Sequence, residues 1–132
     1  MILVDSTVWI DFFNGRITPQ TDYLADMIAN QPILVGDIIL GEVLQGFKNE
    51  MHFEKALHAL VRFQQISLVT PELAVQSARN YRALRTIGIT VRKTIDCFIA
   101  TFCIVKEHDF LHSDKDFDSF EQHLGLRVIH PK

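Results

Sequence analysis

The sequence has little of several features that define large classes of protein. Only two of its 132 residues are cysteines, too few for a disulfide framework. No apolar run approaches the roughly 20 residues of a membrane span, and Met1–Asp5 lacks the charged and apolar regions of a secretory signal. Basic residues are not in excess either, because the formal net charge is −3, so there is no global signature of nucleic-acid binding. We therefore expect a cytoplasmic protein without a membrane segment.

The two cysteines are not placed to act together. Cys97 and Cys103 are six positions apart in a predicted helix, so their side chains point about 240° apart around its axis. In that geometry they can neither bridge each other nor share a metal ion. We expect both to be small buried apolar side chains in a reducing compartment.

What the chain does have is enough apolar sequence to form a core. Hydrophobic residues make up 48% of the chain and charged residues 22%, a balance that argues against disorder. The length fits one compact domain and leaves no room for two. We expect a single domain spanning residues 1–132.

Short apolar segments alternate with helical patterns along the whole chain. The segments expected to be strands are Met1–Val4, Ile33–Val35, Ile66–Val69, Phe110–Leu111 and Leu126–Ile129. The segments expected to be helices are Ser6–Phe13 (capped by Ser6 or Thr7), Thr21–Asn30, Asp37–Phe47, Glu50–Gln64, Pro71–Thr86 and Thr94–Lys106. This alternation predicts an α/β protein, a three-layer α/β/α sandwich with a mainly parallel central sheet.

Acidic residues occur in apolar surroundings, where a globular chain would not normally place them. They lie at the ends of predicted strands or inside the most hydrophobic helical stretches, and they are Asp5, Glu42, Asp96, Asp114 and Asp116. An ionised carboxylate is very costly to bury without a partner, and no lysine or arginine lies next to the first three. A divalent metal ion shared among them would explain their presence.

The positions of these acids in the predicted fold support a shared site. Asp5 ends one strand and Asp114 closely follows another, and ligands of parallel sheets bind beyond the carboxyl ends of the strands. Asp96 falls in the first turn of its helix, where the helix dipole favours an anion. Oxygen-only ligands select hard cations such as Mg²⁺ or Mn²⁺, and such ions serve phosphodiester hydrolysis.

Four blocks of sequence, in order, carry a resemblance to a known family. They are Val4–Ile10, Gly41–Gly46, Thr94–Ala100 and Leu111–Phe117, and the closing Gly125–Ile129 fits the last strand of the same family. On these blocks the chain resembles a PIN domain, and within that superfamily a VapC-type toxin ribonuclease of a type II toxin–antitoxin system. The resemblance covers essentially the whole chain.

The resemblance implies an activity and a set of site residues. Its metal-coordinating and catalytic acids would be Asp5, Glu42, Asp96 and Asp114, with Asp116 as a further metal ligand. Asp5, Asp96 and Asp114 would hold the principal ion, Glu42 would hold a second ion or position the attacking water, and Thr7 would orient Asp5. Family members are Mg²⁺- or Mn²⁺-dependent endoribonucleases, commonly homodimers, that act on RNA such as tRNA or rRNA and are inhibited by a cognate VapB-type antitoxin.

Basic and aromatic residues near the acids have two readings each. Arg85, Arg92 and Lys93 could contact RNA phosphates, or they could form a solvated helix face. Aromatic residues near Asp5 could stack on a base, but on a helix they more often pack in the core or at a partner interface, which we favour. These aromatic residues are Trp9, Phe12 and Phe13.

Other functions fit the sequence less well. His108 and His112 have the spacing of a zinc helix, but they flank a predicted strand that would separate them by about 13 Å, and we expect His112 to be a surface residue. A receiver-like signalling module would need an acidic pair after the first strand, where Ser6 follows Asp5. The alternative that stays open is a PIN-like module that binds RNA or an antitoxin without cleaving.

Overall fold

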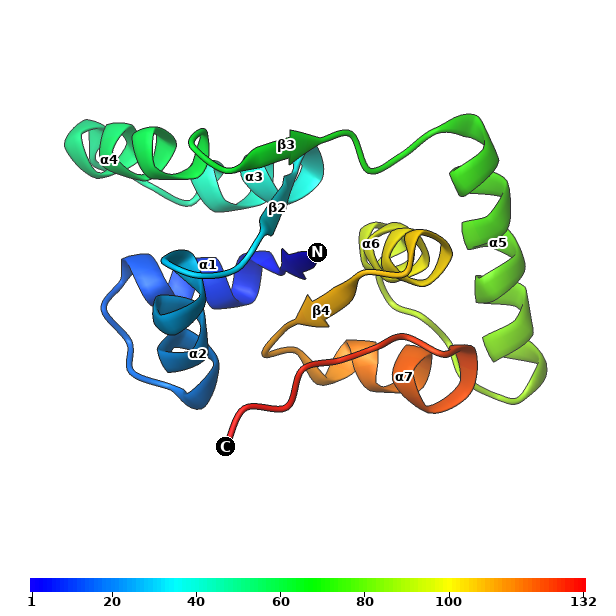
Figure 1. Ribbon diagram of the computed structural model, residues 1–132. Helices are drawn as coiled ribbons and strands as arrows, with labels where there is room; N and C mark the ends of the chain where they lie inside the picture. The colour runs from blue at the N-terminus through cyan, green and yellow to red at the C-terminus, as the bar shows by residue number, and fades with distance from the viewer.

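A parallel four-stranded sheet forms the centre of the molecule, in the strand order β3-β2-β1-β4. A computed structural model describes all 132 residues (Figure 1). The strands are β1 (Ile2–Val4), β2 (Ile33–Gly36), β3 (Gln64–Ile66) and β4 (Asp109–Leu111). The predicted α/β architecture with a parallel sheet is confirmed.

Helices cover both faces of this sheet. They are α1 (Ser6–Phe13), α2 (Pro19–Ile28), α3 (Asp37–Gln45), α4 (Glu50–Leu60), α5 (Pro71–Thr86), α6 (Thr94–Lys106) and α7 (Asp118–Leu124). In Figure 1, α1, α2 and α4 lie to the left of the sheet, and α5 and α6 pack together on its right. The predicted three-layer sandwich is therefore confirmed. None of the helices combines the length and the apolar character that crossing a membrane requires.

The two central strands supply the middle of the hydrophobic core. Every residue of β1 and β2 is buried, and Leu3, Val4 and Val35 have no exposed surface. Strands with a near-continuous apolar run are typical of parallel sheets covered on both faces. Trp9 belongs to the same core at 1% exposure, as its helical position suggested.

The cap of α1 differs from the prediction. Ser6 and Thr7 are both inside the helix, and Asp5 is the cap: its backbone is extended and its carboxylate accepts from the Thr7 N–H at 3.4 Å. Aspartate is as good a helix cap as serine, and here the capping residue directly follows the last residue of β1. The first candidate acid is thus fixed at a strand-to-helix junction.

The predicted boundaries around β3 are also wrong. The helix α4 ends at Leu60 instead of Gln64, and the strand occupies Gln64–Ile66 instead of Ile66–Val69. The strand β3 is at the edge of the sheet, and two of its three residues, Gln64 and Gln65, are polar and exposed. An edge strand of this kind lacks the apolar run that marks a buried strand.

The C-terminal segment forms less sheet than expected. Instead of a strand over Leu126–Ile129 there is one parallel bridge, between Phe110 and Val128. Phe110 donates its N–H to the Arg127 carbonyl at 2.8 Å and accepts from the Ile129 N–H at 2.9 Å. The segment therefore pairs with β4 over a single residue, which a sequence pattern cannot distinguish from a short strand.

Candidate metal centre

The register of β1 and β4 brings the acids to one edge of the sheet. Val4 pairs with Leu111, so the residues that follow each strand leave the sheet side by side. The Asp5 N–H donates to the Leu111 carbonyl at 2.9 Å, which extends the ladder by one residue. Asp5 and the segment from His112 onward therefore meet at the carboxyl ends of adjacent strands.

Asp5 is held by its neighbour Thr7. The Thr7 hydroxyl donates to the Asp5 Oδ2 at 2.7 Å and accepts from the Ser113 N–H at 3.2 Å. Asp5 is only 3% exposed, and this burial raises its pKa to about 6. The charge of Glu42 raises it further, while the hydrogen bonds from Thr7 oppose the rise. Asp5 is thus oriented by one hydroxyl that also ties the segment after β4.

Three carboxylates lie close enough to share one ion. Asp96, Asp114 and Asp116 each offer an oxygen, and these oxygens all lie within 4.8 Å of one another. Asp96 comes from the first turn of α6, whereas the other two come from the segment after β4. Burial is the main cause that raises the pKa of Asp96 to about 6, with further contributions from the charges of Asp5, Asp114 and Asp116.

The segment after β4 is a tight turn that presents two of these acids together. The Asp114 carboxylate accepts from the Asp116 N–H at 2.9 Å and caps a short 3₁₀ helix, Lys115–Phe117. The Asp114 N–H in turn donates to His112 Nδ1 at 3.1 Å. Both ends of the Asp114–Asp116 pair are therefore fixed by hydrogen bonds within the turn.

Glu42 approaches the same group from α3. Burial raises the pKa of its carboxyl, and the charge of Asp96 adds to that rise. A hydrogen bond with the Ser6 side chain and the charge of Lys93 act in the opposite direction. Its Oε1 is buried and has no hydrogen-bond partner. Glu42 therefore has a buried carboxylate oxygen without a partner, and its charge interacts with those of Asp96 and Asp5.

The donor set fits a hard divalent cation. All the candidate ligands are carboxylates, and Asp96 Oδ2 is a second buried oxygen that has no hydrogen-bond partner. Lys93 is the one basic residue whose charge lowers the pKa of both Glu42 and Asp96, and a single positive charge is too little for this many acids. A divalent ion would supply the missing positive charge.

The acids that lie closest together in the structure are not the three that we expected to hold the principal ion. We expected Asp5, Asp96 and Asp114 to surround the principal ion, with Asp116 as a further ligand. The group with mutually close oxygens contains Asp116 and does not contain Asp5. Asp5 and Glu42 adjoin this group instead, as their electrostatic effects on each other and on Asp96 indicate.

His112 is not the surface residue that we expected. It is 8% exposed, and its ring stacks on Phe110 at 5.4 Å and lies 5.1 Å from Phe117. Burial lowers the pKa of its imidazole. The sequence did contain a sign that His112 is buried. Side chains two positions apart in a strand point to the same face, so His112 lies on the same face as the fully buried Phe110. Ser6, the partner of Glu42, gave no such signal, because its contact joins two distant elements.

The basic candidates are exposed, and they differ in how close they are to the acids. Arg85, Arg92 and Lys93 all face solvent. Lys93 precedes α6 and affects the pKa of Glu42 and Asp96, so it borders the site. Arg85 is at the end of α5, where its guanidinium lies over the Tyr81 ring at 5.6 Å.

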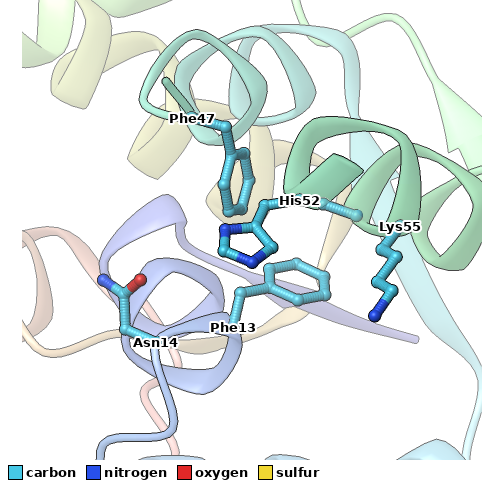
Figure 2. Close-up of a pocket in the computed structure, with 6 residues that line it drawn as sticks. Phe13, Asn14, Phe47, His52 and Lys55 are labelled. Carbon is cyan, nitrogen blue, oxygen red and sulfur yellow. The ribbon is translucent and has the colours of Figure 1, made fainter. Parts of the chain in front are cut away.

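Two cavities of about 370 Å³ each lie on the surface. One borders the acids through Asp114 and is also lined by Gln20, Ser113 and Lys115. The other lies between α1 and α4, where Figure 2 shows the side chains of Phe13, Phe47 and His52 converging, and no acid of the site lines it. Of the two, the first cavity is therefore the one that adjoins the candidate metal centre, through Asp114.

Comparison with known protein families gives the same assignment for nearly the whole chain. The family model described as PIN domain matches residues 2–122. A curated relative, ribonuclease VapC11 of Mycobacterium tuberculosis, is 28% identical over 131 residues, which are 97% of each chain. The predicted resemblance is therefore confirmed at the level of the family.

Solved structures share the fold at low sequence identity. VapBC2 of Rickettsia felis, bound to a DNA fragment from its promoter, superposes with a TM-score of 0.74 and 18% identity over 98% of both chains. A toxin–antitoxin complex from Klebsiella pneumoniae gives 0.74 and 20% over 100% of this chain and 98% of that one. VapC20 of Mycobacterium tuberculosis, described as a toxin that cleaves the sarcin–ricin loop, gives 0.64 and 16% over 90% and 94%.

Proposed function

Because the chain belongs to the PIN-domain family, we propose that it is a metal-dependent endoribonuclease, the toxin of a VapBC-type toxin–antitoxin pair. The observation that carries this proposal is the group formed by Asp96, Asp114 and Asp116, whose oxygens lie within 4.8 Å of one another at the carboxyl edge of the sheet. Asp5 and Glu42 adjoin it. VapC11, the relative that spans the chain, is named as a ribonuclease.

The metal is Mg²⁺ or Mn²⁺ in this proposal. Asp96, Asp114 and Asp116 would hold it, and Asp5 and Glu42 would complete its surroundings or hold a second ion. When bound, such an ion stabilises negative charge on phosphoryl oxygens and lowers the pKa of coordinated water. The all-oxygen donor set favours these hard cations over zinc.

The residues of the chain position the reaction. Thr7 holds Asp5 in one orientation through its hydroxyl, and the Ser6 side chain lowers the pKa of the Glu42 carboxyl. Glu42, with its free Oε1 and raised pKa, is suited to accept the proton of the attacking water. The water oxygen bonds to phosphorus, the bond from phosphorus to the 3′ oxygen breaks, and the departing 3′ oxygen takes a proton from solvent while Glu42 returns its proton to solvent. The products are a 5′-phosphate and a 3′-hydroxyl.

RNA reaches the acids from the side on which Lys93 lies. Lys93, Arg92 and Arg85 are exposed and would contact phosphates, which offsets the repulsion between the acids and the RNA backbone. Lys115 and Ser113 line the cavity beside Asp114 and could contact a flanking nucleotide. Contacts to phosphates position an RNA without selecting its sequence.

The partners in this proposal are a cognate VapB-type antitoxin that covers the acids and a second copy of the chain. The solved structures with the same fold include VapBC complexes, two of them bound to DNA. Those structures are less than 25% identical to this chain, so they indicate the fold and leave the antitoxin of this protein to be identified.

The test is cleavage of structured RNA by the purified protein in Mg²⁺ or Mn²⁺. We expect wild-type protein to cleave, EDTA to abolish cleavage, and the Asp96→Asn variant to lose at least about a hundredfold in rate, because it removes one ligand of the group. Asp26→Asn, an exposed acid of α2, is the matched control and should cleave normally. Equal rates for wild type and Asp96→Asn would refute the proposal. Metal binding without cleavage of any RNA would favour the non-cleaving module.

A further inference from the structure

We propose that His112 is a positioning residue for the metal centre: its Nδ1 accepts the Asp114 N–H and thereby sets the turn that presents Asp114 and Asp116. The importance of that turn rests on the proposed metal-dependent function. The hydrogen bond itself exists without a metal, so it can be tested separately.

The contacts form a short chain from the sheet to the ligands. His112 is the residue directly after β4, and its Nδ1 accepts from the Asp114 N–H at 3.1 Å. Asp114 Oδ1 accepts from the Asp116 N–H at 2.9 Å. The carboxylates of Asp114 and Asp116 then meet that of Asp96 within 4.8 Å. A displacement of the imidazole would therefore change the backbone that carries two of the three acids.

This hydrogen bond fixes the protonation of the ring. A nitrogen that accepts a hydrogen bond carries no proton, so the neutral imidazole of His112 must carry its proton on Nε2. A charged imidazolium could not accept from Asp114 at all. The ring is 8% exposed and packs against both Phe110 and Phe117, whose own rings contact each other, and this packing limits its rotation. The bond from Asp114 thus requires the tautomer with its proton on Nε2, an atom that is buried and has no hydrogen-bond partner of its own.

The other histidine that flanks β4 provides a natural comparison. His108 precedes the strand and packs on an aromatic ring, that of Phe102, at 5.5 Å. Its Nδ1 is buried without a hydrogen-bond partner, and its ring nitrogens are not part of the group that Asp96, Asp114 and Asp116 form. The two histidines share their aromatic packing, and only His112 accepts a hydrogen bond from a ligand residue.

Substitutions can separate the hydrogen bond from the packing. Asparagine places an amide oxygen near the position of Nδ1 and keeps an acceptor for Asp114 but loses the ring. Phenylalanine keeps a ring against Phe110 and Phe117 but offers no acceptor. Glutamine places its oxygen nearer the position of Nε2. If His112 acts only by packing, His112→Phe should bind Mn²⁺ more tightly than His112→Asn. If it acts by positioning Asp114, His112→Asn should bind Mn²⁺ more tightly than His112→Phe.

The measurements are Mn²⁺ affinity by calorimetry and hydrogen exchange of the Asp114 amide by NMR. We expect His112→Phe and His112→Gln to weaken Mn²⁺ binding about tenfold or more, and His112→Asn to stay within about threefold of wild type, as is usual for groups that orient metal ligands. The Asp114 amide should exchange faster in the first two variants and remain protected in the third. His108→Phe should leave both measurements unchanged.

Either of two results would overturn this inference: His112→Phe with wild-type Mn²⁺ affinity and a protected Asp114 amide, or His112→Asn with losses equal to those of His112→Phe. Nitrogen chemical shifts that place the proton of the neutral His112 ring on Nδ1 would also overturn it. If the wild-type protein binds no Mn²⁺, the metal-dependent function is wrong, and exchange of the Asp114 amide in metal-free protein decides the role of His112 by itself.

Discussion

At the scale of single residues, the candidate site is a set of acids that the metal-free fold tolerates poorly. Burial raises the pKa of Asp5 and of Asp96 from 3.8 to about 6, so ionising either carboxyl costs more free energy in the folded protein than in an unfolded chain. Glu42 is shifted in the same direction. Groups of this kind are expected where function, and not stability, determines the residue.

The effect of Asp5 on stability has a definite sign. Its pKa is 3.8 in an unfolded chain and about 6 when folded, so the folded protein binds more protons between these values. Its contribution to stability is present in full below pH 4 and is lost as the pH rises through about 6. Asp5→Asn should remove this loss and raise the free energy of unfolding of the metal-free protein at pH 7.5 by about 2–3 kcal/mol.

Urea denaturation in EDTA between pH 5 and pH 8 measures this effect. The Asp5→Asn variant should show a weaker dependence on pH than wild type, and the exposed Asp26→Asn should follow wild type. A variant that is less stable than wild type at pH 7.5 would mean that the Asp5 carboxylate stabilises the fold despite its burial.

At the scale of elements, the junction after β2 depends on a glycine. A Cβ at Gly36 would lie 2.6 Å from Cγ of Leu68, a buried side chain in the segment after β3. The same segment is tied to the start of α3, because the Leu68 N–H donates to the Asp37 carboxylate at 3.1 Å. The close packing of the Leu68 side chain on the Gly36 backbone, together with this hydrogen bond, therefore helps to align α3, which carries Glu42.

Gly36→Ala should consequently destabilise the protein by about 1–3 kcal/mol, since Leu68 must move out of a packed core. Urea denaturation gives this value directly. Gly46→Ala is the matched control, because a Cβ there would meet its nearest neighbour, the Val43 carbonyl oxygen, at an ordinary 3.5 Å. If Gly36→Ala is as stable as Gly46→Ala, Leu68 adapts freely and the junction does not require glycine.

The elements also show how far a sequence predicts this fold. Buried strands such as β1 and β2 were predictable because both their faces are covered, which leaves an apolar run. The edge strand β3 was misplaced, because one side of an edge strand faces solvent. The helix α7 was not predicted, since its sequence is dominated by polar residues and only Phe120 is buried.

Prediction of the candidate metal centre from the sequence was limited in the same way. Asp5, Glu42 and Asp96 stood out because each interrupts an apolar stretch, and that signal is local. Which oxygens come within reach of one ion depends on the turn from His112 to Asp116 and on its approach to α6, and no local pattern encodes such a geometry. Sequence therefore indicated the participants, and the structure was needed to arrange them.

At the scale of the whole molecule, a bound metal ion should act as a clamp. The carboxylates come from the junction between β1 and α1, from α3, from α6 and from the turn after β4, so one ion would link elements that are far apart in the sequence. A ligand that binds only the folded state stabilises it by about 2.7 kcal/mol at 100 times its Kd. Relief of the repulsion among the acids is part of the same binding free energy.

Thermal unfolding tests this clamp. Saturating Mn²⁺ at pH 7.5 should raise the Tm of the wild-type protein by roughly 5–10 °C, as the size of the domain and the free energy above imply. The Asp96→Asn variant should show little increase, and Asp26→Asn should match wild type. An equal increase in Asp96→Asn would place the ion elsewhere on the protein.

The pairing of β1 with β4 also determines when the site can exist during synthesis. Asp5 is translated long before Asp109, where β4 begins, and the turn with Asp114 and Asp116 comes later still. The acids cannot assemble on a nascent chain that has not yet reached this strand. A polypeptide organised in this way remains inert while its own ribosome is translating it, and the acids converge only once the last strand of the sheet has been made.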